Sequence, residues 1–122
     1  MVGRGTEIRE LFRDVLTGLG CEVVACDQHD AALDTLKRRP AFAAFVDMQM
    51  PGSDGIRLLQ EIREARPATH VVAMSDYRCD GTVEQALRLG CFVCMMKPIR
   101  ALDILGVLEV LEAGVESLLL AA

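Results

Sequence analysis

Two patterns of apolar residues alternate along the chain. Apolar positions at the i, i+3, i+4 spacing of an amphipathic helix recur in several segments, and short continuous apolar runs lie between them. The helical segments begin near Ile8, after Asp27 as a predicted N-cap, near Ile56, near Val83 and at Ala101. The continuous runs span residues 21–26, 41–46, 70–74 and 91–96, and their shortness is typical of strands buried on both faces.

This alternation predicts an α/β fold with a parallel sheet that helices cover on both faces. Only Met1 and Val2 precede Gly3, so no full strand fits before the first predicted helix. From Ala101 onward we expect a helix that runs to near the C-terminus.

Three of the predicted strands end at a polar side chain. Asp47 follows the second continuous run, Ser75 the third and Lys97 the fourth. Ligands of open α/β sheets bind beyond the carboxyl ends of the strands. We therefore expect a carboxylate, a hydroxyl and an ammonium group to meet at one edge of the sheet. A carboxylate there can act as a nucleophile towards phosphorus, and the other two groups can stabilise phosphoryl oxygens.

The composition limits the classes of protein to which this chain can belong. With 122 residues, 52% of them apolar and 25% charged, the chain is expected to form a single domain with no output domain. A net charge of −5 and scattered basic residues argue against direct nucleic-acid binding. Acidic residues in the last helix, such as Asp103 and Glu109, argue against a membrane span. We expect a cytoplasmic protein, because no secretory signal is visible and the five cysteines are odd in number.

The sequence contains two possible cofactor-binding motifs, and neither is complete. Gly3 and Gly5 begin a G-x-G-x-x-G pattern, but Ile8 occupies its third glycine position, so no nucleotide, flavin or haem is expected. Cys91 and Cys94 form a C-x-x-C pair within an apolar run, where residues three apart should point to opposite faces of a strand. We expect them to be small core residues rather than a redox or zinc site.

Residues 46–55, VDMQMPGSDG, resemble the phosphorylation loop of the receiver domain of two-component response regulators. The run that ends at Ser75 and the Lys-Pro pair at Lys97 follow in family order. The resemblance implies a flavodoxin-like, doubly wound sheet of five parallel strands in the order 2-1-3-4-5. The family's first strand is central to this sheet, but here it is reduced to Met1 and Val2, so it is either truncated or rearranged. In the second case another segment or a second subunit must fill the gap, because unpaired backbone in a sheet is costly. It implies that Asp47 accepts a phosphoryl group and that Mg²⁺ binds Asp47 and the backbone carbonyl of Gln49. It also implies that Ser75 and Lys97 contact the phosphoryl group.

The sequence departs from the family at the implied metal site. Gly3 and Arg4 stand where the family has an acidic pair that holds the metal, so Mg²⁺ binding is expected to be degenerate. The Arg4 guanidinium could mimic the metal's charge beside Asp47, or it could be a solvated residue at a frayed end. Asp76 could repel a phosphoryl group or act as a substitute ligand. Cys94 occupies the aromatic switch position of the family.

The resemblance also implies partners. A sensor histidine kinase or phosphotransfer protein would supply the phosphoryl group, and an effector protein would read the result. The wide apolar stripe of the last helix, which we extend to Leu118, Leu119 and Leu120, suggests a homodimer.

Two other functions remain open besides a degenerate receiver. One is a fully competent, Mg²⁺-dependent phosphoacceptor. The other is a phosphatase with an aspartyl-phosphate intermediate, which would need a second Asp where Gln49 stands, so we do not expect an enzyme.

Overall fold

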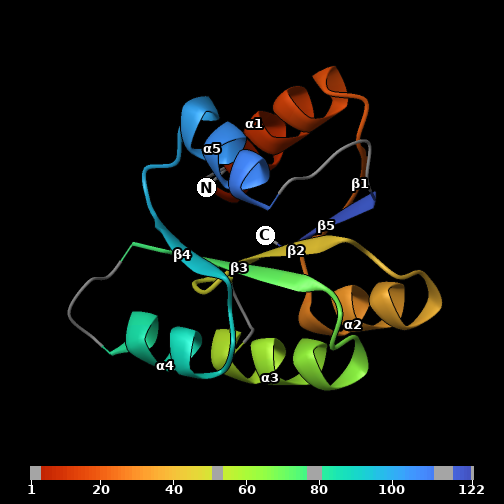
Figure 1. Ribbon diagram of the computed structural model, residues 1–122, viewed down its shortest axis with the longest axis vertical. Coiled ribbons are helices and arrows are strands. Elements are labelled where there is room, and N and C mark those ends of the chain that lie inside the picture. The colour runs from red at the N-terminus through yellow and green to blue at the C-terminus, as the bar shows by residue number, and fades with distance from the viewer. Residues whose placement is uncertain (1–3, 51–53, 77–80, 112–116, 122) are drawn as a thin grey trace.

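A computed structural model of the chain describes all residues except 1–3, 51–53, 77–80, 112–116 and 122. Five strands form one sheet in which every pair of neighbours is parallel, and helices cover both of its faces (Figure 1). The predicted α/β class is therefore confirmed.

Helices and strands alternate along the described part of the chain. The helices are α1 (Arg4–Gly18), α2 (His29–Arg38), α3 (Gly55–Ala65), α4 (Thr82–Arg88) and α5 (Ala101–Val110). The strands are β1 (Glu22–Cys26), β2 (Ala43–Asp47), β3 (His70–Ser75), β4 (Val93–Met96) and β5 (Ser117–Ala121). Within the described residues, each helix is too short or too polar to cross a lipid bilayer.

The sheet separates two hydrophobic cores. On one face, α1 and α5 pack through Phe12, Leu16, Ile104 and Leu108. On the other face lie α2, α3 and α4, which contribute Ala32, Leu33, Leu36, Leu58, Leu59, Ile62 and Ala86 (Figure 1). Except in α4, which contributes Ala86 alone, these residues include pairs at three- or four-residue spacing, which is why these helices were predictable from the sequence.

The second position of the sheet is occupied by β5, from the C-terminal end of the chain. The strand order is β1-β5-β2-β3-β4, so β5 lies between β1 and β2 (Figure 1). The other four strands follow one another as the family order implies. The expectation of a rearranged strand is thus met, and the prediction of a helix running to near the C-terminus is wrong, because α5 ends at Val110 and residues 117–121 form a strand.

Pairing on both sides explains why residues 117–121 are extended. Leu119 is in register with Val24 of β1 and with Ala44 of β2. Leu118 and Leu120 face the α1–α5 core, whereas Leu119 faces the core under α2 and α3. Leucine is a good helix former, but a segment that is apolar on both faces also suits a central parallel strand. Here pairing with β1 and β2 makes the segment a strand rather than a helix.

Two further expectations need correction. The N-cap of α2 is Gln28 rather than Asp27, and no side chain caps that end of the helix. The apolar stripe of the last helix does not extend to Leu118 and its neighbours, because these residues are buried in β5. Any dimer surface on α5 must therefore be built from residues of α5 itself.

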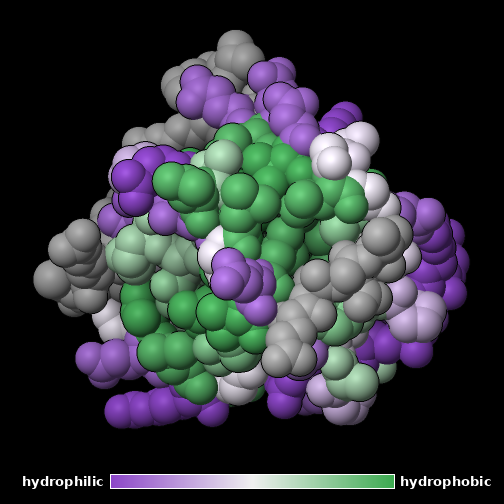
Figure 2. All heavy atoms as spheres, turned by 45° about the horizontal axis from the view of Figure 1, so that its top comes forward, coloured by the Kyte–Doolittle hydropathy of each residue, from purple (hydrophilic) through white to green (hydrophobic). Residues whose placement is uncertain are grey.

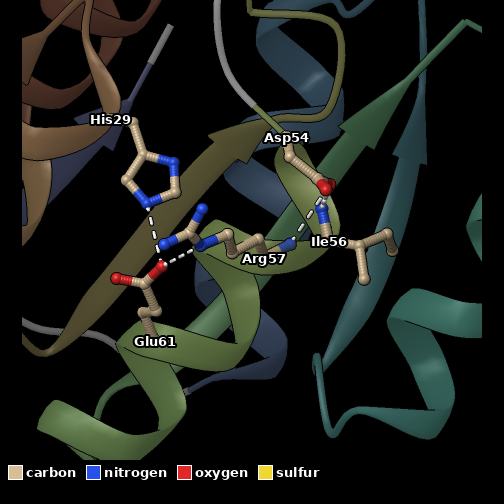
Figure 3. A network of polar contacts seen from close by, with 5 residues as sticks. All are labelled: His29, Asp54, Ile56, Arg57 and Glu61. Carbon is tan, nitrogen blue, oxygen red and sulfur yellow. Dashed lines mark hydrogen bonds and ion pairs between the residues drawn. The ribbon is translucent and has the colours of Figure 1, made fainter.

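A polar cluster joins α2 to α3 (Figure 3). Glu61 of α3 accepts a hydrogen bond from Arg57 Nε at 2.9 Å, and the same oxygen lies 3.3 Å from His29 Nε2 at the start of α2. At the N-terminus of α3, Asp54 Oδ1 accepts hydrogen bonds from the backbone N–H groups of Ile56 and Arg57. Asp54 is thus a side-chain N-cap for the helix that follows the predicted phosphorylation loop.

We predict that Leu119→Ala lowers the free energy of unfolding by about 2–4 kcal/mol, because it leaves a cavity in the centre of the sheet. The partly exposed Leu87 on α4 provides a matched control, since Leu87→Ala should change stability by less than about 1 kcal/mol. Urea denaturation followed by circular dichroism measures both. Equal effects of the two substitutions would contradict a buried central position for residues 117–121.

Candidate functional site

The ends of β2, β3 and β4 bring the three predicted site residues to one edge of the sheet. Lys97 Nζ donates a hydrogen bond of 2.8 Å to Asp47 Oδ1. The backbone N–H of Lys97 donates to the carbonyl oxygen of Ser75 at 2.9 Å, which joins the ends of β4 and β3. Parallel strands end at the same edge, so Asp47 and Lys97, which are 50 positions apart along the chain, become neighbours.

A tight turn after β2 fixes the Asp47 carboxylate. The backbone N–H of Gln49 donates to Asp47 Oδ1 at 2.9 Å, and the N–H of Met50 donates to the Asp47 carbonyl oxygen at 3.2 Å. The N–H of Met48 donates to the carbonyl oxygen of Met74 in β3 at 2.9 Å. The carboxylate is therefore held both by its own turn and by Lys97.

Gly55 allows this turn to pack closely against α3. A Cβ atom at Gly55 would lie 2.9 Å from the Cα and 3.0 Å from the carbonyl oxygen of Met48. Backbone atoms cannot yield as a flexible side chain can, so a larger residue at position 55 would displace the residue next to Asp47.

The ion pair between Asp47 and Lys97 is almost fully buried. Their side chains are only 7% and 10% exposed, respectively. Two charges in such a place attract each other strongly, but both lose hydration, so the pair fixes geometry more than it adds net stability. Removal of one partner is costly because the other charge stays buried.

The Gln49 side chain reaches from the turn after β2 to the end of β3. Gln49 Nε2 donates to Ser75 Oγ at 3.2 Å, and the backbone N–H of Asp76 donates to Gln49 Oε1 at 3.2 Å. Sequence reasoning assigned a role to the backbone carbonyl of Gln49 but not to this carboxamide. The only available signal was its place two residues after Asp47, which does not define a rotamer.

Comparison with protein families identifies this arrangement. Residues 5–109 match the family described as the response regulator receiver domain. The chain belongs to this family. The resemblance noted in residues 46–55 is thereby confirmed at the level of the family.

Known response regulators are similar to this chain in sequence, and a known receiver domain is similar to it in fold as well. The chain is 36% identical over 94 residues to the response regulator protein FleR of Pseudomonas aeruginosa, which covers 77% of this chain and 20% of that protein. It is 31% identical to the receiver domain of NtrX from Brucella abortus, with a TM-score of 0.79 and coverage of 89% and 93%. The chain thus spans about a fifth of the length of the curated relatives that it matches.

The receiver fold recurs at lower sequence identity. A receiver domain protein from Methanospirillum hungatei has a TM-score of 0.81 at 23% identity, covering 88% of this chain and 86% of that one. This likeness supports the fold alone, including the flavodoxin-like order of the strands.

A cleft of about 550 Å³ opens beside the ion pair of this receiver domain. It is lined by Glu7 and Ile8 of α1, by Asp76 after β3 and by Lys97. Asp76, the predicted substitute ligand, is therefore in the vicinity of the site. Access from solvent to the edge of the sheet thus exists on the α1 side.

The implied acidic pair falls at the edge of the described region. Gly3 lies outside the described residues, and Arg4 is the first residue of α1, with a side chain that is also outside the described part. The hypothesis that Arg4 mimics the metal's charge therefore stays a prediction. Among described residues, no group of three or more His, Cys, Asp or Glu side chains could hold a metal ion.

The two cysteines of the C-x-x-C pair pack into one core. Cys91 and Cys94 both contact the core under α2, α3 and α4, so the expectation of opposite faces is wrong, because Cys91 precedes the start of β4 at Val93. Burial raises the pKa of the Cys91 thiol to about 11 and also raises that of Cys94. At neutral pH such thiols are poor nucleophiles and metal ligands.

We predict that Lys97→Met lowers the free energy of unfolding by about 3 kcal/mol, because it leaves the Asp47 carboxylate buried without its cation. Adding Asp47→Asn to this variant should recover part of the loss. Chemical denaturation of the two single variants and the double variant gives the coupling between the residues.

Arg57→Met is the matched control for this cycle. It breaks an ion pair with Glu61 in which the Arg57 side chain is 73% exposed, so it should cost less than about 0.5 kcal/mol. If Lys97→Met were no more costly than Arg57→Met, the Asp47–Lys97 pair would not be the buried pair described above.

Proposed function

We propose that this chain is a signalling module in which Asp47 accepts a phosphoryl group from a histidine kinase. The observation that carries the proposal is the contact of 2.8 Å between Lys97 Nζ and Asp47 Oδ1, beside Ser75, in a chain of the receiver family. A carboxylate, a cation and a hydroxyl at one point are the groups that phosphoryl transfer to an aspartate requires.

The transfer can be written with Asp47 as the nucleophile. Within the described residues, both hydrogen bonds to the carboxylate are made to Oδ1, from Lys97 and from the Gln49 N–H, which leaves Oδ2 to attack phosphorus. The new Asp47 O–P bond forms as the N–P bond of the kinase's phosphohistidine breaks. The electron pair of that bond returns to the imidazole nitrogen. Lys97 and the Ser75 hydroxyl then stabilise the phosphoryl oxygens.

The residues of this site do not fit the magnesium that the family implies. Magnesium prefers several oxygen ligands, usually including carboxylates, in near-octahedral geometry. Here the Lys97 ammonium already neutralises Asp47, and no cluster of three metal-binding side chains lies among the described residues. Gly3 and Arg4 bring no carboxylate. We therefore propose a receiver with degenerate metal binding that acts through protein contacts.

A hydrolase is the less well supported alternative. Turnover of an aspartyl phosphate needs a group that activates water, and the carboxamide of Gln49 cannot act as a general base. Gln49 is also engaged with Ser75 and with the Asp76 N–H. A site without a general base at position 49 favours a module that holds a phosphoryl group over an enzyme that releases it.

The partners follow from the same proposal. A histidine kinase or phosphotransfer protein would supply the phosphoryl group, and an effector would bind the modified surface. One similar protein, from Klebsiella pneumoniae, is described as the DNA-binding transcriptional regulator NtrC, and the chain covers 21% of it. By analogy, the effector of this receiver would be another domain or protein rather than the receiver itself.

We predict that an acyl phosphate slowly adds one phosphoryl group to the protein, and that magnesium changes the rate by less than about tenfold. Intact-mass spectrometry over time, with and without Mg²⁺, measures this reaction. The Asp47→Asn variant should take up no phosphoryl group.

Asp54→Asn is the matched control for that substitution. Asp54 is exposed and caps α3, and asparagine is an equally good N-cap, so this variant should be phosphorylated as the natural chain is. Absence of any increment would contradict Asp47 as an acceptor. A prompt increment that depends on magnesium would instead contradict the degenerate metal site and favour a fully competent phosphoacceptor.

The α5 helix offers a surface for self-association. Leu102 and Val110 are 75% and 68% exposed, and Leu105, which lies between them in the sequence, is 38% exposed. Figure 2 brings the side of the molecule with α1 and α5 forward, and hydrophobic side chains gather at the centre of this face. Exposed apolar surface of this kind commonly marks a protein interface. We propose a homodimer through α5.

We predict that sedimentation velocity detects a monomer–dimer equilibrium, and that Leu102→Glu shifts it at least about tenfold towards monomer because it places a charge in the interface. Leu87→Glu on α4, where Leu87 is 48% exposed, is the control and should leave the equilibrium unchanged. A natural chain that stays monomeric at high concentration would contradict the dimer.

A further inference from the structure

The geometry points to the Gln49 side chain as an occupant of the phosphoryl position, which must leave before Asp47 can be modified. This inference rests on the proposed function of Asp47 and adds a residue that controls how readily the modification occurs. It concerns the unphosphorylated protein, in which the carboxamide of Gln49 spans the ends of β2 and β3.

Two hydrogen bonds place the carboxamide. The N–H of Asp76 can only donate, so the oxygen of the carboxamide must face it, and the two atoms are 3.2 Å apart. The carboxamide nitrogen then faces Ser75 Oγ, also at 3.2 Å. Each of these partners is a group that a phosphoryl oxygen on Asp47 could use as a donor.

The carboxamide oxygen resembles a phosphoryl oxygen in its hydrogen bonding. Both accept a bond from a backbone N–H, and the phosphoryl oxygen does so more strongly because it is charged. Ser75 is fully buried, so the carboxamide also donates a hydrogen bond to a hydroxyl that is shielded from solvent at the end of β3. A hydroxyl can rotate its proton, which lets Ser75 accept from Gln49 in one state and donate to a phosphoryl oxygen in the other.

The position of Gln49 allows an exchange between these two states. Its backbone N–H is fixed to Asp47 Oδ1 at 2.9 Å, so the side chain starts beside the nucleophile. The residue is only half-buried, unlike Ser75, and rotation about its side-chain bonds can carry the carboxamide towards solvent. Entry of the phosphoryl group would therefore break both Gln49 contacts without movement of the strands.

The test compares Gln49→Ala with Gln49→Glu in the full chain, using acetyl phosphate and intact-mass spectrometry. Gln49→Ala should be phosphorylated about five- to fiftyfold faster than the natural chain, because two hydrogen bonds no longer have to be broken. Gln49→Glu should be slower than the natural chain, since a carboxylate holds the Asp76 N–H more tightly and repels the anionic donor. Gln60→Ala, at an exposed glutamine of α3, is the matched control and should have no effect.

A second measurement separates this inference from the proposed function. Hydrogen exchange of the Asp76 backbone N–H, followed by NMR without any phosphodonor, should be faster in Gln49→Ala than in the natural chain and unchanged in Gln60→Ala. If neither the natural chain nor Gln49→Ala takes up a phosphoryl group, the proposed function fails, and the exchange rate alone decides whether Gln49 occupies the position. Equal phosphorylation rates in a reactive protein, or an unchanged Asp76 exchange rate, would overturn the inference.

Discussion

The middle of a parallel sheet needs a strand that is paired on both sides, and this constraint governs the rest of the structure. In this chain β5 meets it by pairing with β1 along five register positions and with β2 along four. Without such a strand, the backbone groups of β1 and β2 that face each other would be buried without partners. The pairing also aligns β2, whose last residue is Asp47. The strand formed by residues 117–121 therefore supports the candidate site at the end of β2.

The site depends on that alignment in a simple way. Once β2, β3 and β4 lie parallel, their last residues share an edge, and Asp47, Ser75 and Lys97 become neighbours. The buried ion pair and the Gln49 carboxamide then satisfy the polar groups that this edge leaves in a poorly solvated place. The Gln49 carboxamide, which contacts Ser75 and the Asp76 N–H, is the group that we propose a phosphoryl group must displace.

The α/β fold and the meeting of Asp47, Ser75 and Lys97 were predictable because they follow from local patterns of apolar and polar residues. The strands at residues 41–46 and 70–74 are continuous apolar runs that end at polar residues, and their parallel alignment follows from the helices between them. Residues 117–121 were misassigned because a leucine-rich segment suits a helix and a buried strand equally, and only pairing with β1 and β2 distinguishes them. The side chain of Gln49 was missed for a related reason, since its rotamer is set by Ser75 and Asp76 from another strand.

The central claim is that residues 117–121 form an inner strand of the sheet, paired with β1 on one side and β2 on the other, and NMR tests it most directly. Strong sequential contacts between Hα and the next backbone N–H are expected along this segment, as in any extended strand. Contacts across the sheet are expected from Leu119 to Val24 on one side and to Ala44 on the other. A helical pattern of contacts in residues 117–121, or contacts from Leu119 to neither strand, would contradict this account of the fold.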